Sequence, residues 1–157
     1  MTYDLENVLE DIRKIIDGKL NDQIAIVNAE KNDGMVLKVI PEKAIFLQQM
    51  NGDQANYDPL LLYGVDDIGT TPNGPYGSDK YQMSVIIIVQ DSGQDVNIGK
   101  RMFRYLKALR ATFQENWISN FGAQVTIESN VPVPLTNLNT NQTYRAVGVT
   151  LNVTIAP

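Results

Sequence analysis

The chain has 157 residues, of which 43% are hydrophobic and 20% are charged, as is ordinary for one globular domain. It has no cysteine and no histidine, which excludes disulfide frameworks, thiolate metal sites and every Ser-His or Cys-His arrangement. We therefore predict a single domain over residues 1–157 that is not an enzyme and carries no cofactor and no metal.

Charge is divided unevenly along the chain, whose formal net charge is -5. Residues 1–67 hold 13 acidic and 6 basic side chains, whereas residues 68–157 hold 5 acidic and 7 basic ones. Halves of opposite charge suit head-to-tail docking between copies of the chain. The acidic start is unlike a signal peptide, and the longest apolar run, Val85 to Val89, is too short to cross a membrane. We therefore expect synthesis and retention in a cytoplasm, with no membrane partner.

Residues 5–27 are predicted to form a long amphipathic helix. Thr2 or Asp4 can cap its start, Gly18 can kink or split it, and Asn32-Asp33-Gly34 ends it. The apolar residues that recur at helical spacing are Leu5, Leu9, Ile12, Ile16, Leu20, Ile24 and Val27.

Strands are predicted next, at Met35–Ile40, Ala44–Gln49 and Leu60–Val65. The glycine- and proline-rich residues 66–79 are predicted to form a first long loop. Residues 81–89 are apolar at alternate positions and, at the centre, on both faces, which is typical of a strand in the middle of a sheet that is covered on both sides.

A second helix is predicted over residues 95–117, with Asp95 as its N-cap. Its apolar arc consists of Ile98, Met102, Tyr105, Leu106, Leu109 and Phe113, and Lys100, Arg104 and Lys107 lie nearly opposite. Trp117 and Phe121, at its end, are expected to pack in the core.

Three further segments complete the chain. Residues 124–128 are predicted to form a strand, and residues 129–143 a second long loop, in which prolines and asparagines oppose a regular ladder. Alternation from Ala146 to Ile155 predicts a last strand with one buried face. The predicted fold is α+β: a long N-terminal helix and a second central helix packed on a mixed, mainly antiparallel β-sheet, with two long loops.

Two patterns could carry ligand chemistry. GPYGSDK at residues 74–80 has no GxxxxGK[ST] spacing, so a surface loop is the better interpretation. The pairs Asp66/Asp67 and Asp91/Asp95 could hold a hard cation such as Mg²⁺ or Ca²⁺. Neither pair has the spacing of a calcium loop, so no metal site is predicted.

The basic helix face of Lys100, Arg104 and Lys107 is the sharpest feature of the sequence. It could contact phosphates, in which case its affinity would fall with salt. No base-reading module accompanies it. We favour a solvated face, or one that meets the acidic half of a neighbouring copy.

Three stretches carry a resemblance to a known family: YQMSVIIIVQDSG at 81–93, VNIGKRMFRYLKALRATFQ at 96–114 and YRAVGVTLNVTIAP at 144–157. Together with the order of elements, they make the chain resemble the tail terminator (tail completion) proteins of tailed bacteriophages. The resemblance implies a homohexameric ring that caps the head-proximal end of the tail tube and ends its polymerisation. It implies as partners the tail tube protein, neck or connector proteins and the sheath of contractile tails. Genomic DNA would pass through the lumen without sequence-specific binding, in a virion assembled in the host cytoplasm.

Under this resemblance, candidate residues for contacts between subunits or rings come from the two predicted loops and the basic helix face. They are Asp66, Asp67, Pro72, Tyr76, Lys100, Arg104, Lys107, Pro132, Pro134 and Asn139. Three alternatives remain open: another neck or head–tail connector component, a nucleic-acid-binding module that uses the basic face, and, ranked last, a metal-dependent hydrolase.

Overall fold

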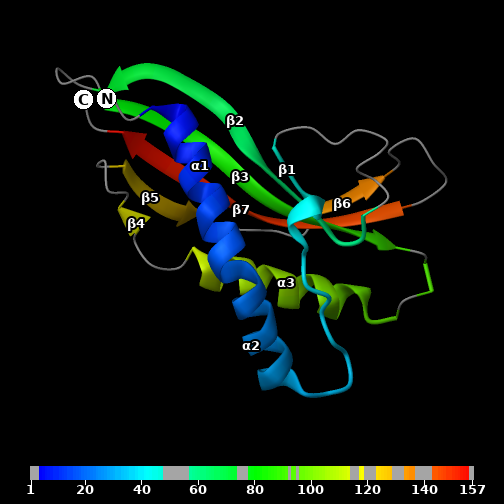
Figure 1. The fold of residues 1–157 in the computed structure, drawn as a ribbon. Coiled ribbons are helices and arrows are strands. Elements are labelled where there is room, and N and C mark those ends of the chain that lie inside the picture. The colour runs from blue at the N-terminus through cyan, green and yellow to red at the C-terminus, as the bar shows by residue number, and fades with distance from the viewer. Residues whose placement is uncertain are drawn as a thin grey trace.

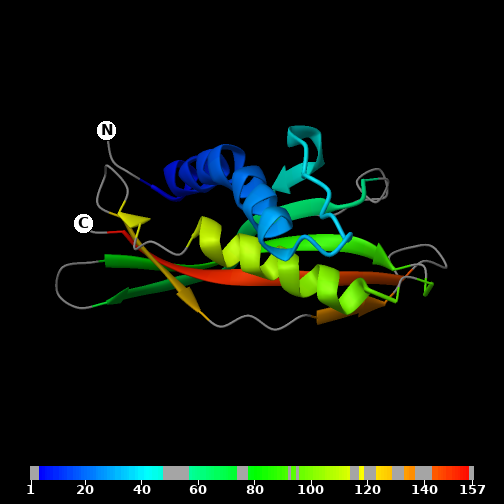
Figure 2. The ribbon, with the colours of Figure 1, turned by 90° about the horizontal axis from the view of Figure 1, so that it is seen from below.

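A computed structural model shows two helical segments on one side of a twisted seven-stranded sheet (Figures 1 and 2). This arrangement confirms the predicted α+β class. The structure describes the backbone of residues 4–47, 57–73, 78–91, 93–94, 96–113, 117–118, 123–128, 133–136 and 143–155. Within these ranges, no helix is both long enough and apolar enough to cross a membrane.

The N-terminal helical segment is one long rod made of α1 (Leu5–Ile15), the π-helical turn η1 (Ile16–Leu20) and α2 (Asn21–Lys31). Asp4 caps its start through a reciprocal capping box with Asn7. Asn32, which has a φ of 36°, ends it in the left-handed conformation. The predicted helix, its cap at Asp4 and its end are confirmed, and Gly18 lies in the π turn that interrupts the regular helix.

The sheet has the strand order β1-β2-β3-β7-β5-β4, and β6 pairs with β7 beside β5. Among the described strand pairs, β1 and β2 alone are parallel; β2–β3, β3–β7, β5–β7, β4–β5 and β6–β7 are antiparallel. The bounds are β1 (Ile45–Leu47), β2 (Leu60–Asn73), β3 (Ser78–Asp91), β4 (Trp117–Ile118), β5 (Ala123–Glu128), β6 (Val133–Thr136) and β7 (Thr143–Ile155). The predicted position of residues 81–89 in the middle of the sheet is confirmed.

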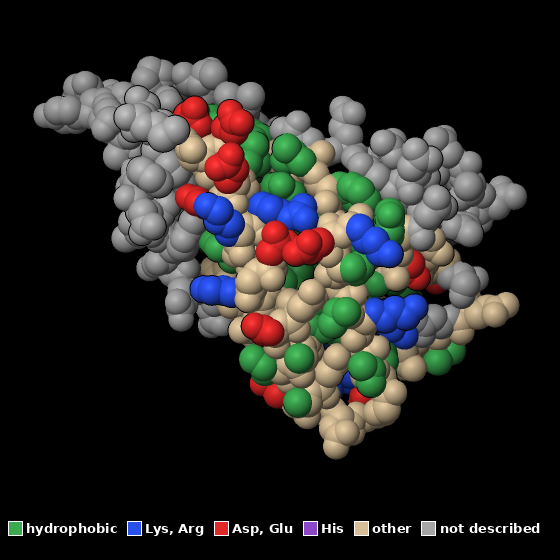
Figure 3. All heavy atoms as spheres, viewed as in Figure 1, with side chains coloured by type: hydrophobic (Ala, Val, Ile, Leu, Met, Phe, Trp, Pro, Cys, Tyr) green, Lys and Arg blue, Asp and Glu red, His purple; other side chains and the backbone are tan. Residues whose placement is uncertain are grey.

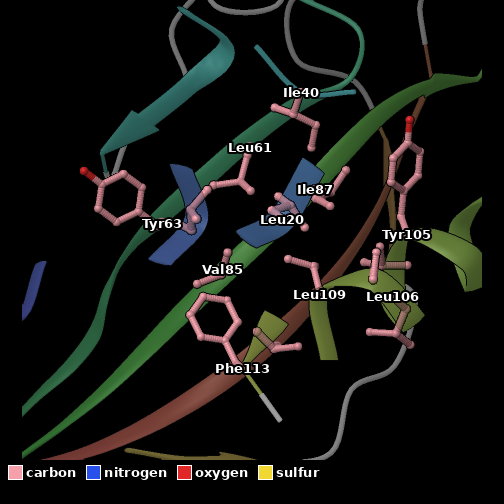
Figure 4. Packing of buried hydrophobic residues seen from close by; sticks show 14 of the residues in the cluster. Leu20, Ile40, Leu61, Tyr63, Val85, Ile87, Tyr105, Leu106, Leu109 and Phe113 are labelled. Atoms are coloured by element: carbon pink, nitrogen blue, oxygen red, sulfur yellow. The ribbon is translucent and has the colours of Figure 1, made fainter. Parts of the chain in front are cut away.

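The main core lies between the sheet and the helices, including α3 (Ile98–Thr112), which connects β3 to β4. Figure 4 shows Val85 and Ile87 of β3 facing Leu109 of α3 and Leu20 of the N-terminal rod. On the opposite face of the sheet, the described residues form a smaller buried cluster of Leu60, Ile88, Tyr144 and Ala146. No helix of the described chain covers that face (Figure 2), so the prediction that the central strand is covered on both sides is only partly correct.

The two predicted long loops are shorter than the sequence indicated. β2 continues to Asn73 and β3 starts at Ser78, so residues 66–73, 78 and 79 belong to strands and residues 74–77 lie outside the described part. The β2–β3 register shifts between Val65 and Asp67 and again between Gly69 and Asn73. These irregularities accommodate glycine and proline in a ladder that is otherwise continuous.

In the second predicted loop, 129–143, residues 133–136 form β6 and Thr143 begins β7. Pro134 can occupy β6 because, among the described strands, β6 pairs only with β7, which leaves the other side of β6 without a ladder that needs a backbone donor. Residues 129–132 and 137–142 lie outside the described part.

Two further predictions are wrong. Residues 35–40 form no strand; they are extended but pair with no other strand of the described chain. The second helix begins at Ile98, with Asn97 rather than Asp95 at the N-cap position and no side-chain cap, and it ends at Thr112. Asp95, Phe121 and the Trp117 side chain lie outside what the structure describes.

Candidate interaction surface

Helix α3 packs on two sides, against the sheet and against the N-terminal rod. Its predicted apolar arc is confirmed: five of the six residues are buried, and Ile98 is half-buried. The predicted basic face is only partly correct, because Arg104 is just 6% exposed. It is buried because residues 33–36, after α2, cover that flank of the helix.

Arg104 is held by a bidentate ion pair with Asp33, just beyond the end of α2. Its Nη1 donates to Asp33 Oδ1 at 2.9 Å and to the carbonyl oxygen of Met35 at 3.2 Å, while Nη2 donates to Asp33 Oδ2. Lys100 Nζ lies 3.5 Å from the same carboxylate. The hydrogen bond from Arg104 holds the pKa of Asp33 far below its usual range. Arg104 therefore fixes the position of α3 relative to α2.

Lys107 makes a second link between α3 and α2. Its Nζ lies 2.6 Å from Glu30 Oε2, and this hydrogen bond lowers the pKa of the Glu30 carboxyl. Both side chains are about half exposed, so this ion pair contributes little to stability. All three predicted basic residues are thus engaged with acidic side chains of the same chain, which leaves a weaker phosphate-binding surface than the sequence indicated.

A strap, residues 34–41, runs along α2 and is attached to it by two asparagine side chains. Asn28 Oδ1 accepts from the N–H of Leu37 at 2.8 Å and its Nδ2 donates to the Leu37 carbonyl at 3.1 Å; Asn21 makes the same pair of bonds with Ile40, both at 2.9 Å. Asn21 and Asn28 are seven residues apart on the helix, which is a rise of about 10 Å. Leu37 and Ile40 are three residues apart in the strap, which in an extended chain also spans about 10 Å, so each asparagine lies opposite its partner. The asparagines therefore take the place of a neighbouring strand.

The other end of the strap region and its inner side are also held by side chains. Arg13 donates from Nη1 to the carbonyl of Ile45 and from Nη2 to that of Glu42. The hydroxyl of the buried Tyr105 donates to the Lys38 carbonyl at 2.9 Å. Burial raises the pKa of this Tyr105 hydroxyl well above its usual value, so it remains a donor at any physiological pH.

The solvent-exposed face of α3 consists of Lys100, Phe103, Lys107 and Arg110, which we call the α3 face. These positions recur at intervals of three and four residues, so they lie along one side of the helix. Phe103 is 62% exposed, and neither Phe103 nor Arg110 forms a hydrogen bond, ion pair or ring contact within the described part of the chain. Neither residue was among the candidate interface residues selected from the sequence. The wide angle around the helix axis between Phe103 and the apolar arc could have indicated that Phe103 is exposed.

The first turns of α1 present an acidic surface, which we call the acidic end: Asp4, Glu6 and Glu10. All three are exposed, and Figure 3 shows acidic side chains gathered over the start of this helix. Glu6 and Glu10 have no hydrogen-bonding or ionic partner among the described residues. Because they are four residues apart on a helix, their like charges repel each other.

The described loop candidates belong to strands β2 and β6, which lie toward opposite ends of the sheet (Figure 1). Asp66, Asp67 and Pro72 lie on β2, on the way to the β2–β3 connection, and Pro134 lies on β6. Tyr76, Pro132 and Asn139 lie outside the described residues. Among the described candidates, the structure therefore does not bring the residues of β2 together with Pro134 of β6.

Asp91, one of the carboxylates considered for a cation, has a structural role. It accepts a hydrogen bond from the backbone N–H of Gly93 and pairs with Arg145 Nε at 3.0 Å on β7, and both contacts, the first more strongly, lower its pKa. The described residues contain no group of three or more acidic side chains arranged to hold a metal ion.

A surface hollow of about 660 Å³ lies between the strap and the first turn of α3. Its charged lining is mixed, because Asp33 contributes to it together with Lys100 and Arg101. A site for phosphate would instead concentrate positive charge, so the hollow does not resemble one.

We expect the protein to lose stability in acid. Asp33, Glu30 and Asp91 all have a lowered pKa in the folded state. These carboxylates therefore stabilise the fold fully above about pH 4, which is near their pKa in the unfolded chain, and this stabilisation is lost as the pH falls below it. The urea midpoint should be constant from pH 7 to about 4 and should then decline. In Asp33→Asn the decline should be smaller, and an equally steep decline in that variant would contradict the role assigned to Asp33.

No protein-family model matches the chain, and no curated protein sequence matches it. Its function is therefore inferred from its own residues and their arrangement.

Proposed function

We propose that this chain is a structural subunit of a phage tail that forms a ring on the head-proximal end of the tail tube. In this role it ends tube polymerisation and joins the tail to the neck. The ring is a homohexamer by the resemblance described above, and its partners are the tail tube protein on one side and neck or connector proteins on the other.

One observation carries the proposal: the strand ends that flank the two connections expected to reach other molecules lie at opposite ends of the sheet (Figure 1). The β2–β3 connection lies at one end of β3 and the β6–β7 connection at the other, where Asp91 of β3 pairs with Thr143 of β7. β3 has 14 residues, so at roughly 3.3 Å per residue these ends lie roughly 40 Å apart. A subunit between two different rings needs contact surfaces on two opposite sides.

The sheet face that no helix of the described chain covers also supports an assembling subunit. Beside the small cluster around Ile88, this face carries the half-buried residues Ile86, Ser84 and Thr150 on the two central strands. An antiparallel sheet can leave such a face exposed to solvent, so this surface is available to a partner. Assembly would bury more of it.

A neighbouring neck or connector component remains the second candidate, because it too would need partners at both ends. A nucleic-acid-binding module is disfavoured, since Lys100, Arg104 and Lys107 are all engaged with Asp33 or Glu30.

The first test is native mass spectrometry of the purified chain over a range of protein and Mg²⁺ concentrations. We expect a dominant species at six times the 17.5 kDa chain mass, because a heterologous contact whose rotation closes gives a ring. Negative-stain electron microscopy of that species should show a ring with a central hole. Addition of the ring to polymerising tail-tube protein should then limit tube length, whereas a connector component would leave tube length unchanged. A strict monomer under every condition would contradict a self-assembling ring.

A further inference from the structure

We propose that the contact between neighbouring subunits is made by the acidic end of one copy docking on the α3 face of the next. The inference rests on the proposed ring and names the surfaces that build it. It also explains why both surfaces carry charges without partners in the described monomer.

The α3 face has the composition of a docking surface. Phe103 is a large exposed aromatic side chain at its centre, and aromatic residues, phenylalanine included, are enriched at the cores of protein interfaces. Lys100, Lys107 and Arg110 surround it on the same side of the helix. Lys100 and Lys107 share their charge with Asp33 and Glu30, whereas Arg110 is without a partner in the described structure. The face is therefore apolar at its centre and positive at its rim.

The acidic end complements the α3 face both in charge and in apolar area. Glu6 and Glu10 are exposed and unpaired within the described residues, and their mutual repulsion is relieved if cations of another molecule approach. Leu5 and Leu9 are half-buried beside them, which offers apolar area for Phe103. Charge complementarity of this kind sets partner choice and orientation.

The positions of the two surfaces suit a ring. The acidic end lies at the top of Figure 1, whereas α3 crosses the foreground of Figure 2, the view from below. Because the surfaces have no residue in common, each copy offers one surface of each kind to two different neighbours. Such a head-to-tail contact closes into a ring or continues as a fibre, according to its rotation.

The test reverses charge on each surface separately. Glu6→Lys/Glu10→Lys alters the acidic end, and Phe103→Glu/Arg110→Glu alters the α3 face without touching the Lys107–Glu30 ion pair. The matched control, Asp22→Lys/Lys38→Glu, changes exposed charges that lie on neither surface. Far-UV circular dichroism checks the fold of each, and Arg110→Glu alone replaces the second variant if that variant unfolds.

We expect each altered protein to need at least a tenfold higher concentration than wild type or the control for ring formation. An equimolar mixture of the two altered proteins should form rings of alternating subunits, because the two unaltered surfaces still fit each other and the two charge-reversed surfaces are again complementary. All four substitutions in one chain should restore the ring. Rings that form as readily in both altered proteins as in wild type would overturn this contact and leave the ring itself standing. A monomeric wild type would overturn both.

Discussion

Replacement of both Asn21 and Asn28 by alanine is expected to lower the free energy of unfolding by about 4 kcal/mol. Each side chain makes two hydrogen bonds to partly buried backbone groups of the strap. Without them, the N–H and carbonyl groups of Leu37 and Ile40 are left beside a helix that offers no other partner. Urea denaturation should show about half of this loss in each single variant.

Hydrogen exchange gives the more specific readout for this pair. The amides of Leu37 and Ile40 donate to the two asparagines, so their protection should fall much more than that of the β3 amides. Asp22→Ala is a suitable control, because Asp22 is exposed on the same helix, and should change stability by less than about 0.5 kcal/mol. Unchanged protection at Leu37 and Ile40 in the double variant would contradict the role of the asparagines.

Gly148→Val is expected to destabilise the protein by about 3 kcal/mol, with a smaller loss for Gly148→Ala. Gly148 of β7 pairs with Ile86 of β3, and a Cβ atom there would lie 2.9 Å from the backbone carbonyl oxygen of Val85 and 3.0 Å from Ile86 Cγ1. The contact with the backbone oxygen can be relieved only if the paired strands β3 and β7 shift relative to each other.

Gly99→Ala is the matched control for this substitution. Gly99 lies in α3, and nothing stands within 4 Å of an added Cβ atom. Alanine there should stabilise the helix by up to about 1 kcal/mol. Thermal melts of both variants compare the two glycines directly, and equal melting temperatures for Gly148→Val and wild type would show that the ladder has room for the side chain.

The elements that follow from local sequence were predictable. The capping box at Asp4, the left-handed end at Asn32 and the alternation in β7 depend on residues close together in the chain. The length of β2 was not predictable from local sequence. Its second half is rich in glycine and proline and is held by pairing with β3 rather than by its own strand propensity.

The interaction surface was predictable only in part. Lys100 and Lys107 do lie on the exposed side of α3, as their spacing indicated. Arg104 does not, because Asp33, 71 positions earlier in the chain, and the strap cover its flank. Helical spacing gives the direction of a side chain but not which distant segment lies over it.

The central place of β7 has a consequence for how the chain folds during synthesis. β7 pairs on one side with β3, up to Asp79 with Ile155, and on the other side with β5 and β6. Neither β5 nor β6 has its place in the sheet until β7 has left the ribosome, and the inner edge of β3 stays open until then. The nascent chain must therefore keep an apolar strand, with Val85, Ile87 and Val89, from pairing wrongly while its last partner is still being made. Closure of such distant pairs is slow compared with helix formation, so the N-terminal rod can form early and shield one face of the β2–β3 hairpin.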